Sequence, residues 1–372
     1  MKYDKSMLEM RMGKVRKVLS HRDGVTELIL DIEHEVKKAL NYDFITGNVS
    51  EGDWLILNTS AASMSLGTGG YHFVIANLTH KSLNLSPGGH GMKVRYTPFQ
   101  VKVAFAEEEL VHMRDVFNRS LDLTGKLIFF CQLHSMVPPL CAYIHYYYLK
   151  YQYKPKIAYI MTDHAALPLA FSKNIAYLRE KNLLDTVITI GNAIGGDLEC
   201  VNIYTALQAA ATVKKGDIII ISMGPGITGT GTRYGFSGLE LGFYLDLAYR
   251  HKGQCCLIPR ISFADSRHRH YGISHHSITI LKDIISSPLY IVLPNLSKQK
   301  LRYLFLQLKN NHLLERYSVC LADGREIINA MKYYEISVTT MSRGISDDPE
   351  FFFSIGSAAK KALSLFYLLD RV

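Results

Sequence analysis

The sequence predicts an α/β protein with a small β-rich N-terminal barrel or sandwich, followed by a doubly wound, mostly parallel, Rossmann-like sheet. Up to about residue 105, short runs rich in β-branched and aromatic residues are separated by turn signals, without helix-like segments between them. From residue 126, apolar runs alternate with helix-like segments, as in parallel sheets buried on both faces. The predicted parts are a barrel-like domain over 1–105, a helical linker over 106–125 and a Rossmann-like domain over 126–372.

Composition places the chain among ordinary globular proteins. Of its 372 residues, 48% are hydrophobic and 20% are charged, which is typical of a chain with a sizeable core. The net charge is +9, but the basic residues are scattered and form no long block. This charge is compatible with acidic ligands, a membrane surface or nucleic acid, and it selects none of them. We expect neither a membrane nor nucleic acid as the partner. We expect a small anionic molecule as the ligand, and a homo-oligomer remains open.

The cysteines and the apolar segments favour a cytoplasmic location. None of the six cysteines belongs to a C-x-x-C pair, and most lie in apolar runs, so we expect buried and reduced thiols. The N-terminal residues contain no apolar stretch typical of a signal peptide. The most apolar window, 127–149, is interrupted by Gln132, His134 and the pair Pro138-Pro139. It therefore fits a buried strand and helix rather than a membrane span.

The expected strands of the N-terminal region are 14–19, 26–32, 53–57, 71–78 and 100–105. Glycine-containing turns separate them, which suits a small barrel or sandwich. One loop, 58–70, is built from small and hydroxyl residues, as is a later loop at 224–238. For loop 58–70, a flexible connection is the alternative to a functional role.

In the α/β region, the expected strands are 127–131, 157–161, 186–190, 217–222, 255–259 and 290–293. The expected helices are 137–150, 167–181, 198–213, 239–250, 277–285 and 298–309. Two further strands, 317–321 and 335–339, would flank a helix at 327–332, and a last helix is expected over 350–369. The crossovers should be right-handed, but the order of the strands is not predictable from the sequence.

Loop 224–238 is the first candidate for a binding site, because it is rich in glycine and threonine and joins a strand to a helix. Ordering such a loop is costly, since glycine loses the most backbone freedom on folding. An anion held by backbone N–H groups and a helix N-terminus would account for it. A tight structural turn or a subunit contact is the alternative. The expected ligand-binding residues are Gly224, Gly226, Thr228, Gly229, Thr230 and Gly231.

Two nucleotide-binding motifs fit this loop poorly. Gly224, Gly226 and Gly229 match G-x-G-x-x-G, but more glycines follow and the next strand ends at Pro259-Arg260 without an acidic partner. A P-loop would need lysine followed by serine or threonine where the chain has Thr230-Gly231. The sequence therefore identifies no cofactor, and a general cradle for phosphate or carboxylate remains.

The segment 260–276, which follows the fifth strand, is the best candidate for reactive groups. Arg260, Arg267 and Arg269 could bind an oxyanion through paired hydrogen bonds, and Arg260 and Arg267 are the expected ligand-binding residues. Asp265, His275 and His276 could transfer protons, because histidine titrates near neutral pH. A solvated loop whose histidines cap the next helix is the alternative. Asp265, His268 and His270 could also bind a metal, but their spacing matches no zinc pattern, so no metal site is predicted.

Asp163, at the end of the second strand, is a further candidate acid or base, with a helix N-cap as the alternative. Ser135 and Ser222 follow or end strands, but neither lies in G-x-S-x-G, which argues against a serine hydrolase. Polar groups and glycines follow nearly every strand of the α/β region. Ligands bind at the carboxyl ends of the strands in open α/β sheets, so we expect the ligand site at that edge.

Four stretches together resemble a bacterial family classed as domain of unknown function 3866. They are Asn58–Phe73, Thr162–Ser172, Gly224–Gly238 and Ile261–His276. The resemblance covers nearly the whole chain. The family pattern has glycine after the Thr-Asp pair, where this chain has His164, so the resemblance does not support His164 as a catalytic residue. It implies no activity, and the chemistry depends on the residues themselves.

Two functions fit these residues. The first is an enzyme, a transferase or hydrolase, acting on a phosphorylated or carboxylated small molecule at the carboxyl edge of the sheet. The second is a non-catalytic regulatory module that binds a nucleotide or metabolite, and the sequence leaves open whether the protein is an enzyme. Catalysis would require Asp163, Asp265 and the paired histidines to converge on one molecule. Separate surroundings would favour the binding module.

Overall fold

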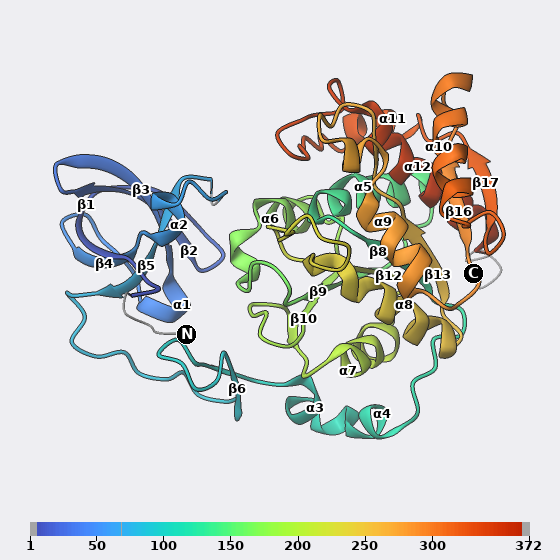
Figure 1. Ribbon diagram of the computed structural model, residues 1–372. Coiled ribbons are helices and arrows are strands. Elements are labelled where there is room, and N and C mark those ends of the chain that lie inside the picture. The colour runs from blue at the N-terminus through green and yellow to red at the C-terminus, as the bar shows by residue number, and fades with distance from the viewer. Residues whose placement is uncertain (1–5, 68, 367–372) are drawn as a thin grey trace. The chain divides into compact units, whose positions relative to one another are not determined.

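The computed structural model describes residues 6–67 and 69–366 and contains two compact units, Met1–Val103 and Ala104–Val372 (Figure 1). The first unit is built on a β-barrel and the second on a parallel sheet with helices. In the described part of the chain, no helix is long and apolar enough to span a lipid bilayer. The mixed α/β class and the N-terminal barrel are therefore confirmed.

The barrel closes in the order β1-β2-β3-β5-β4, with β3 and β5 parallel. Strand β1 contains 13 residues and has two register irregularities along its pairing with β2. Such irregularities bend a strand, and β1 pairs with both β2 and β4. Leu28, Leu30, Leu55 and Leu57 fill the interior. The five strands are Met10–Arg22, Val25–Ile32, Glu35–Tyr42, Trp54–Asn58 and Tyr71–Asn77.

One barrel strand, β3, was not predicted. Its first four residues are exposed and its last four are buried, so it lacks the alternation by which a half-buried strand is recognised. Two short helices of this unit, α1 (Asp43–Thr46) and α2 (Ser60–Ser63), were also not predicted. The strand expected at 100–105 is shorter, Val101–Val103 (β7), and pairs with β6 (Gly91–Lys93) outside the barrel.

The second unit begins with short helical segments and continues into a six-stranded sheet in which every pairing is parallel. The helical segments are α3 (Ala106–Glu109), η1 (Val111–Met113) and α4 (Arg114–Asn118). The strand order is β11-β10-β9-β12-β8-β13, which differs from the classical Rossmann order. The strands are β8 (Leu127–Cys131), β9 (Ile157–Thr162), β10 (Thr186–Thr189), β11 (Leu198–Glu199), β12 (Ile218–Met223) and β13 (Gln254–Ile258).

Helices cover both faces of this sheet (Figure 1). Along β12, Ile218 and Ile220 pack into one core, and Ile219 and Ile221 pack into the other. The first core contains α5 (Val137–Leu149), α6 (Lys173–Glu180), α11 (Ile327–Tyr333) and α12 (Pro349–Leu365). The second contains α7 (Ile203–Gln208), α8 (Glu240–Arg250), the segment of α9 (His275–Thr279) and η7 (Ile280–Ile284), and α10 (Lys298–Asn310). Burial on both faces explains the continuous apolar runs of the strands.

Four expectations for this unit need correction. The helix expected from 198 begins at Ile203, because Leu198–Glu199 adds a sixth strand and Asn202 forms the helix cap. The strand Tyr290–Pro294 (β16) pairs with Ser318–Ala322 (β17) in a separate two-stranded parallel sheet. Residues 335–339 form no strand. The last helix ends at Leu365, and the remainder of its predicted range, from 367, lies outside the described residues.

The strand order creates a switch point between β9 and β12, which lie side by side. The chain leaves β9 toward β10 on one side and leaves β12 toward β13 on the other. Adjacent strands whose connections depart in opposite directions leave a crevice at their carboxyl ends, where ligands bind in open α/β sheets. The carboxyl ends of β9 and β12 are therefore the first place to look for a site.

The close backbone approach of Gly356 on α12 to Gly324 makes a stability prediction. A Cβ atom on Gly356 would lie 2.3 Å from the Gly324 carbonyl oxygen, too close for either backbone to stay in place. We expect Gly356→Ala to lower the free energy of unfolding by about 1–3 kcal/mol through overpacking. Far-UV circular dichroism during urea unfolding would measure this, because helices are concentrated in the second unit.

Gly344→Ala is the matched control, because its nearest neighbour would lie 3.7 Å from the added Cβ atom. If Gly356→Ala unfolds at the same urea concentration as Gly344→Ala, the close approach described for α12 is incorrect.

Candidate functional site

An acid–histidine cluster, consisting of Asp163, His164 and Glu240, lies at the switch point. Asp163 and His164 directly follow β9, and Glu240 is the first residue of α8, which follows loop 224–238. The Nδ1 atom of His164 is 3.5 Å from Asp163 Oδ1 and 2.5 Å from Glu240 Oε2. The His164 side chain is 49% exposed, whereas Glu240 is 7% exposed. Glu240 thus lies buried at the inner end of the cluster, and His164 keeps the outer end open to solvent.

The structure fixes one oxygen of each carboxylate in this cluster. Asp163 Oδ2 accepts a hydrogen bond of 2.9 Å from the backbone N–H of Asn192. Gly191 makes room for that carboxylate, since it has a φ of +59° and a Cβ atom there would lie 2.1 Å from Asp163 Oδ2. The Thr162 hydroxyl donates to Glu240 Oε1. The cap of α6 is Ser172, so Asp163 does not serve as its N-cap.

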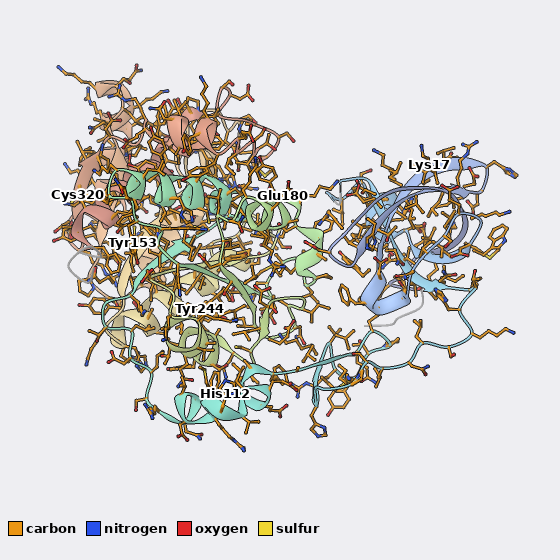
Figure 2. All side chains as sticks on the ribbon, turned by 180° about the vertical axis from the view of Figure 1, so that it is seen from behind. Lys17, His112, Tyr153, Glu180, Tyr244 and Cys320 are labelled. Atoms are coloured by element: carbon orange, nitrogen blue, oxygen red, sulfur yellow. The ribbon has the colours of Figure 1, made fainter. Side chains whose placement is uncertain are left out.

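Burial raises the pKa of Glu240, while the hydrogen bond from Thr162 and the charge of His164 oppose the rise. Tyr244, one turn further along α8 and labelled in Figure 2, also interacts with this carboxylate. Burial raises the pKa of the Tyr244 hydroxyl, so that it stays protonated. A carboxyl group with a raised pKa beside a half-exposed histidine is an arrangement that can hold or transfer a proton.

Loop 224–238 extends from the end of β12 into solvent and returns to α8. Residues 228–234 are all exposed. Inside the loop, the Thr230 N–H donates to Gly235 O at 2.8 Å, and the Thr228 N–H donates to Ser237 Oγ at 3.1 Å. These two amides are thus used within the loop and are not available for an anion. Gly224 has a structural reason to be glycine, because a Cβ atom there would lie 2.6 Å from Ala166 O.

A second group of polar residues, the histidine–arginine cluster, lies against this loop. The ring of His276 stacks on Phe236 with a centroid distance of 4.0 Å, and it is the nearest group to a Cβ atom placed on Gly229. Arg269 reaches the same loop, with Nη1 2.9 Å from the Cβ position of Gly231. The cluster consists of His270, His275, His276, Arg260, Arg267 and Arg269.

Asp265 is the buried carboxylate of this cluster, and three arginines bind it. Asp265, which is 4% exposed, accepts from Arg260 at 2.9 Å, from Arg267 at 2.8 Å and from Arg343 at 3.4 Å. These cations, with the Arg267 hydrogen bond foremost, hold the pKa of Asp265 well below its usual range. Asp348, which pairs with Arg343 at 3.2 Å, is a second buried carboxylate. Asp265 is positioned to balance charge, since arginines surround its carboxylate.

The histidines of the cluster are neutral near pH 7. Burial, followed by the charges of Arg260 and Arg267, lowers the pKa of His270 to about 3. Burial and the neighbouring His275 and His270 lower the pKa of His276 to about 3. The pKa of His275 is lowered as well, first by burial and then by Arg269. His275 Nε2 is buried and has no hydrogen-bond partner among the described residues.

The predicted site residues thus fall into separate surroundings. Asp163 contacts His164 and Asn192, whereas Asp265 contacts three arginines. His275 and His276 come together as expected, next to loop 224–238. The histidine that joins them is His270, while His268, which was considered as a metal ligand but not predicted to be one, is exposed. Catalysis shared by Asp163 and Asp265 would require both carboxylates to reach one molecule, so their separate surroundings favour ligand binding without catalysis.

Three residues of these clusters were not predicted. Glu240 lies in the first turn of the helix after the loop, and an acidic residue at that place was the available signal. Arg343 and Asp348 come from the turn before α12, about 80 residues after Asp265. The polar run at 343–348 just before Pro349 could have indicated a functional turn. Nothing in the sequence indicated which strand ends the turn at 343–348 would reach.

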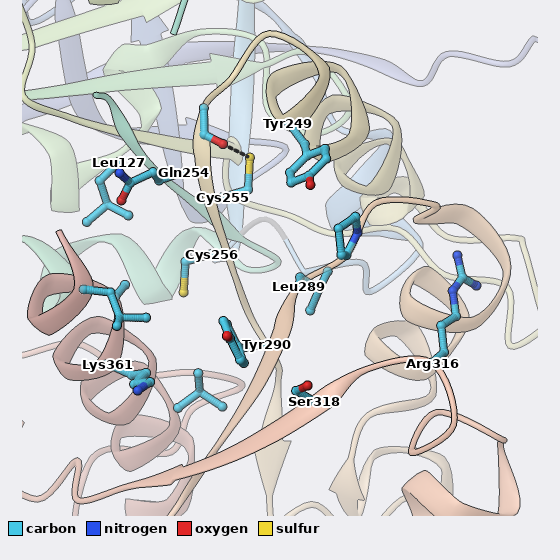
Figure 3. A pocket seen from close by; sticks show the side chains of 15 residues that line it. Leu127, Tyr249, Gln254, Cys255, Cys256, Leu289, Tyr290, Arg316, Ser318 and Lys361 are labelled. Carbon is cyan, nitrogen blue, oxygen red and sulfur yellow. Dashed lines mark hydrogen bonds between the residues drawn. The ribbon is translucent and has the colours of Figure 1, made fainter. Parts of the chain in front are cut away.

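A cavity of about 490 Å³ lies at the opposite, amino edge of the sheet (Figure 3). Leu127 and Gln254, the first residues of β8 and β13, line it together with Cys255, Cys256 and Tyr290. Burial raises the pKa of the Cys256 thiol to about 12, and it also raises that of Cys255. Thiols that stay protonated are poor nucleophiles. This cavity is mostly apolar, and the charged side chains that line it, Arg316 and Lys361, belong to neither cluster at the carboxyl edge.

The fold and the clusters together define an α/β protein with a polar carboxyl edge. The chain belongs to the family DUF3866, described as a protein of unknown function, whose pattern matches residues 38–359. Comparison with curated proteins and with solved structures finds no match. The family membership confirms the resemblance seen in the sequence.

The neutral histidines make stability depend on pH. Unfolded histidine has a pKa near 6.5, so between pH 6.5 and about 3 the unfolded chain binds protons that His270 and His276 exclude. Stability is therefore lost as pH falls through this window, by at most about 1.4 kcal/mol per pH unit for each histidine. The lowered pKa of Asp265 makes stability fall with pH only below the unfolded pKa of aspartate, near 4, because the unfolded chain then takes up a proton that the folded chain does not.

Thermal unfolding between pH 7 and 4.5 measures this effect. We expect the melting temperature of the parent protein to fall more steeply with pH than that of His270→Gln/His276→Gln. Equal slopes for the two proteins would show that these histidines are not held neutral in the folded state.

Proposed function

We propose that this protein binds a phosphorylated or carboxylated small molecule at the carboxyl edge of its parallel sheet, between loop 224–238 and the histidine–arginine cluster. The observation that carries the proposal is unbalanced positive charge. Four arginines, Arg260, Arg267, Arg269 and Arg343, meet two carboxylates, Asp265 and Asp348. Three neutral histidines lie among them. A dianion would balance the two remaining charges.

The arrangement of the arginines supports this role. Arg260 is 3% exposed and its guanidinium is bound by Asp265, so it would attract an anion through its charge without contacting it directly. Arg269 is exposed, reaches Gly231 and has no carboxylate partner within the described residues. An arginine can bind a phosphate or carboxylate through two parallel hydrogen bonds. We infer that Arg269 contacts the anion directly, while Gly226, Gly229 and Gly231 let the backbone approach it.

The same charges argue against a metal ion at the three histidines. Their ring nitrogens lie within 4.8 Å of one another, as in a metal site. However, Arg269 Nε donates to His270 Nε2 at 3.4 Å, which uses the lone pair a metal would need. Nearby arginine charges also repel a cation. An anion is favoured by both observations, and it would raise the pKa of His275 and His276, allowing them to donate protons to it.

A second candidate function is an enzyme, a transferase or hydrolase, with Asp163 and the histidines His275 and His276 in proton transfer. Asp265 would position the arginines. Loop 224–238 supports this reading, because it contacts the histidine–arginine cluster and leads directly into Glu240 of the acid–histidine cluster. The alternative is a regulatory module that binds a nucleotide or metabolite without catalysis. The separate surroundings of Asp163 and Asp265 favour this alternative.

Other expectations remain part of this proposal. The six free cysteines fit a reducing, cytoplasmic compartment. The helices on both faces of the sheet and its switch point support a Rossmann-like relationship despite the different strand order. A bacterial origin follows from the family resemblance, and a homo-oligomer is compatible with the exposed loop 224–238.

Removing Arg269 tests the anion site. We expect sulfate, inorganic phosphate or a sugar phosphate to raise the melting temperature of the parent protein, because a ligand of the native state stabilises it. Arg269→Ala should weaken sulfate binding roughly 10- to 150-fold, the effect of losing a hydrogen bond to a charged group. Sulfate titrations followed by thermal unfolding and calorimetry, in the presence of a metal chelator, measure both effects.

Arg233→Ala is the matched control. Arg233 lies on the same loop and is exposed, but Asp283 binds it through two hydrogen bonds of 2.7 and 2.8 Å. Its removal should leave sulfate affinity nearly unchanged. Equal losses for the two variants would indicate nonspecific attraction to the loop, and no loss for Arg269→Ala would refute the proposed site.

A further inference from the structure

The acid–histidine cluster has the features of a metal site, and these do not depend on the anion site. One ligand atom from each of its residues, Asp163, His164 and Glu240, lies within 4.8 Å of the other two. Atoms that share one cation at bonds of about 2.0–2.2 Å are separated by roughly 3–4 Å. The separations of 3.5 and 2.5 Å around His164 Nδ1 need only small side-chain adjustments to reach that range.

Hydrogen bonding selects the atoms that would bind the ion. The other oxygen of each carboxylate is held by the protein, that of Asp163 by Asn192 and that of Glu240 by Thr162. Metal-binding carboxylates are oriented in this way by outer hydrogen bonds. Glu240 Oε2, in a side chain that is more than nine-tenths buried, accepts no well-aligned hydrogen bond from the described residues, although His164 Nδ1 lies 2.5 Å away. A buried carboxylate oxygen without a well-aligned donor is unusual, and a cation bound beside His164 would satisfy it.

The charge of the cluster also calls for a cation. Two carboxylates face each other, and within the described residues His164 is the basic group at ion-pair distance from them. With both carboxylates ionised, even a protonated His164 would leave one negative charge. The half-exposed His164 keeps one side of the cluster open to water or substrate. Catalytic metal sites have such an open position.

We propose that Asp163, His164 and Glu240 bind one divalent transition-metal ion at the crevice between β9 and β12. Two carboxylate oxygens and one imidazole nitrogen suit Mn²⁺ or Zn²⁺ better than Ca²⁺, which prefers oxygen ligands alone. Thr162 and Asn192 are positioning residues that hold the two carboxylates. With Asp163 bound to the metal, proton transfer in the enzyme candidate falls to His275 and His276. Gly191 is needed because any side chain there would displace Asp163.

Metal titration of the full-length protein tests this proposal. The chain would be treated with a chelator, dialysed without sulfate or phosphate, and titrated with MnCl₂ while electron paramagnetic resonance measures free Mn²⁺. We expect one saturable site per chain, from which Zn²⁺ displaces Mn²⁺ because it binds such ligands more tightly. Asp163→Asn and His164→Gln should each weaken Mn²⁺ binding at least about 10-fold, as even outer-residue changes often do.

Two controls keep the outcomes distinct. Glu180→Gln removes one negative charge from an exposed position on α6, labelled in Figure 2, and should leave Mn²⁺ affinity unchanged. His276→Gln, in the histidine–arginine cluster, should also leave it unchanged. Far-UV circular dichroism would confirm that each variant folds. His164→Gln should disturb packing least, because the His164 side chain is half-exposed.

The proposal is overturned if no saturable site exists, if Asp163→Asn and His164→Gln bind Mn²⁺ as the parent does, or if only His276→Gln loses the metal. Because the Mn²⁺ titration contains no sulfate or phosphate, a negative result would not bear on the proposed anion site. A failure of sulfate to bind would likewise not bear on the proposed metal site.

Discussion

The parallel pairing of β9 with β12 is the constraint on which the carboxyl edge depends. Their register runs from Ile157 opposite Ile218 to Thr162 opposite Met223. It therefore brings the first residues after β9 beside the start of loop 224–238. Because the loop returns to α8, Glu240 reaches the Thr162 hydroxyl and His164. A shift of one residue in this pairing would turn the side chains of β9 to the other face of the sheet and separate these groups.

Two polar clusters of opposite character result at this edge. The acid–histidine cluster has excess negative charge and calls for a cation, whereas the histidine–arginine cluster has excess positive charge and calls for an anion. Loop 224–238 connects them, since it contacts His276 and Arg269 and leads directly into Glu240. A cation and an anion bound at neighbouring places would each strengthen the other's binding. This complementarity is common to metal-assisted chemistry on phosphorylated or carboxylated molecules.

The sequence predicted those parts of the fold that depend on local pattern. The strands β8, β9, β10, β12 and β13 were predicted to within about a residue, because burial on both faces makes them continuous apolar runs. Strand β3 was missed because its exposed and buried residues lie in two blocks rather than alternating. Residues 335–339 have a strand-like composition but pair with no other strand.

The grouping of side chains at the candidate site was predicted only in part, for a physical reason. The carboxyl edge, His275 and His276 could be expected because the ends of parallel strands gather at one edge. Which side chains meet there depends on strand order and on distant turns, which local pattern does not encode. Arg343 reaches Asp265 from a turn about 80 residues later, and Glu240 reaches His164 from another helix. These contacts changed the role inferred for Asp265 from a proton carrier to a balance for arginine charge.

The most direct test of a bound anion at the carboxyl edge is an anomalous difference map from crystals of the full-length protein soaked in selenate. Selenate has the shape and charge of sulfate, and its selenium can be located without phase bias. The expected result is a selenium peak in hydrogen-bond contact with Arg269, next to His276 and Gly229. A peak only in the cavity at the amino edge, beside Arg316 and Lys361, would contradict the account.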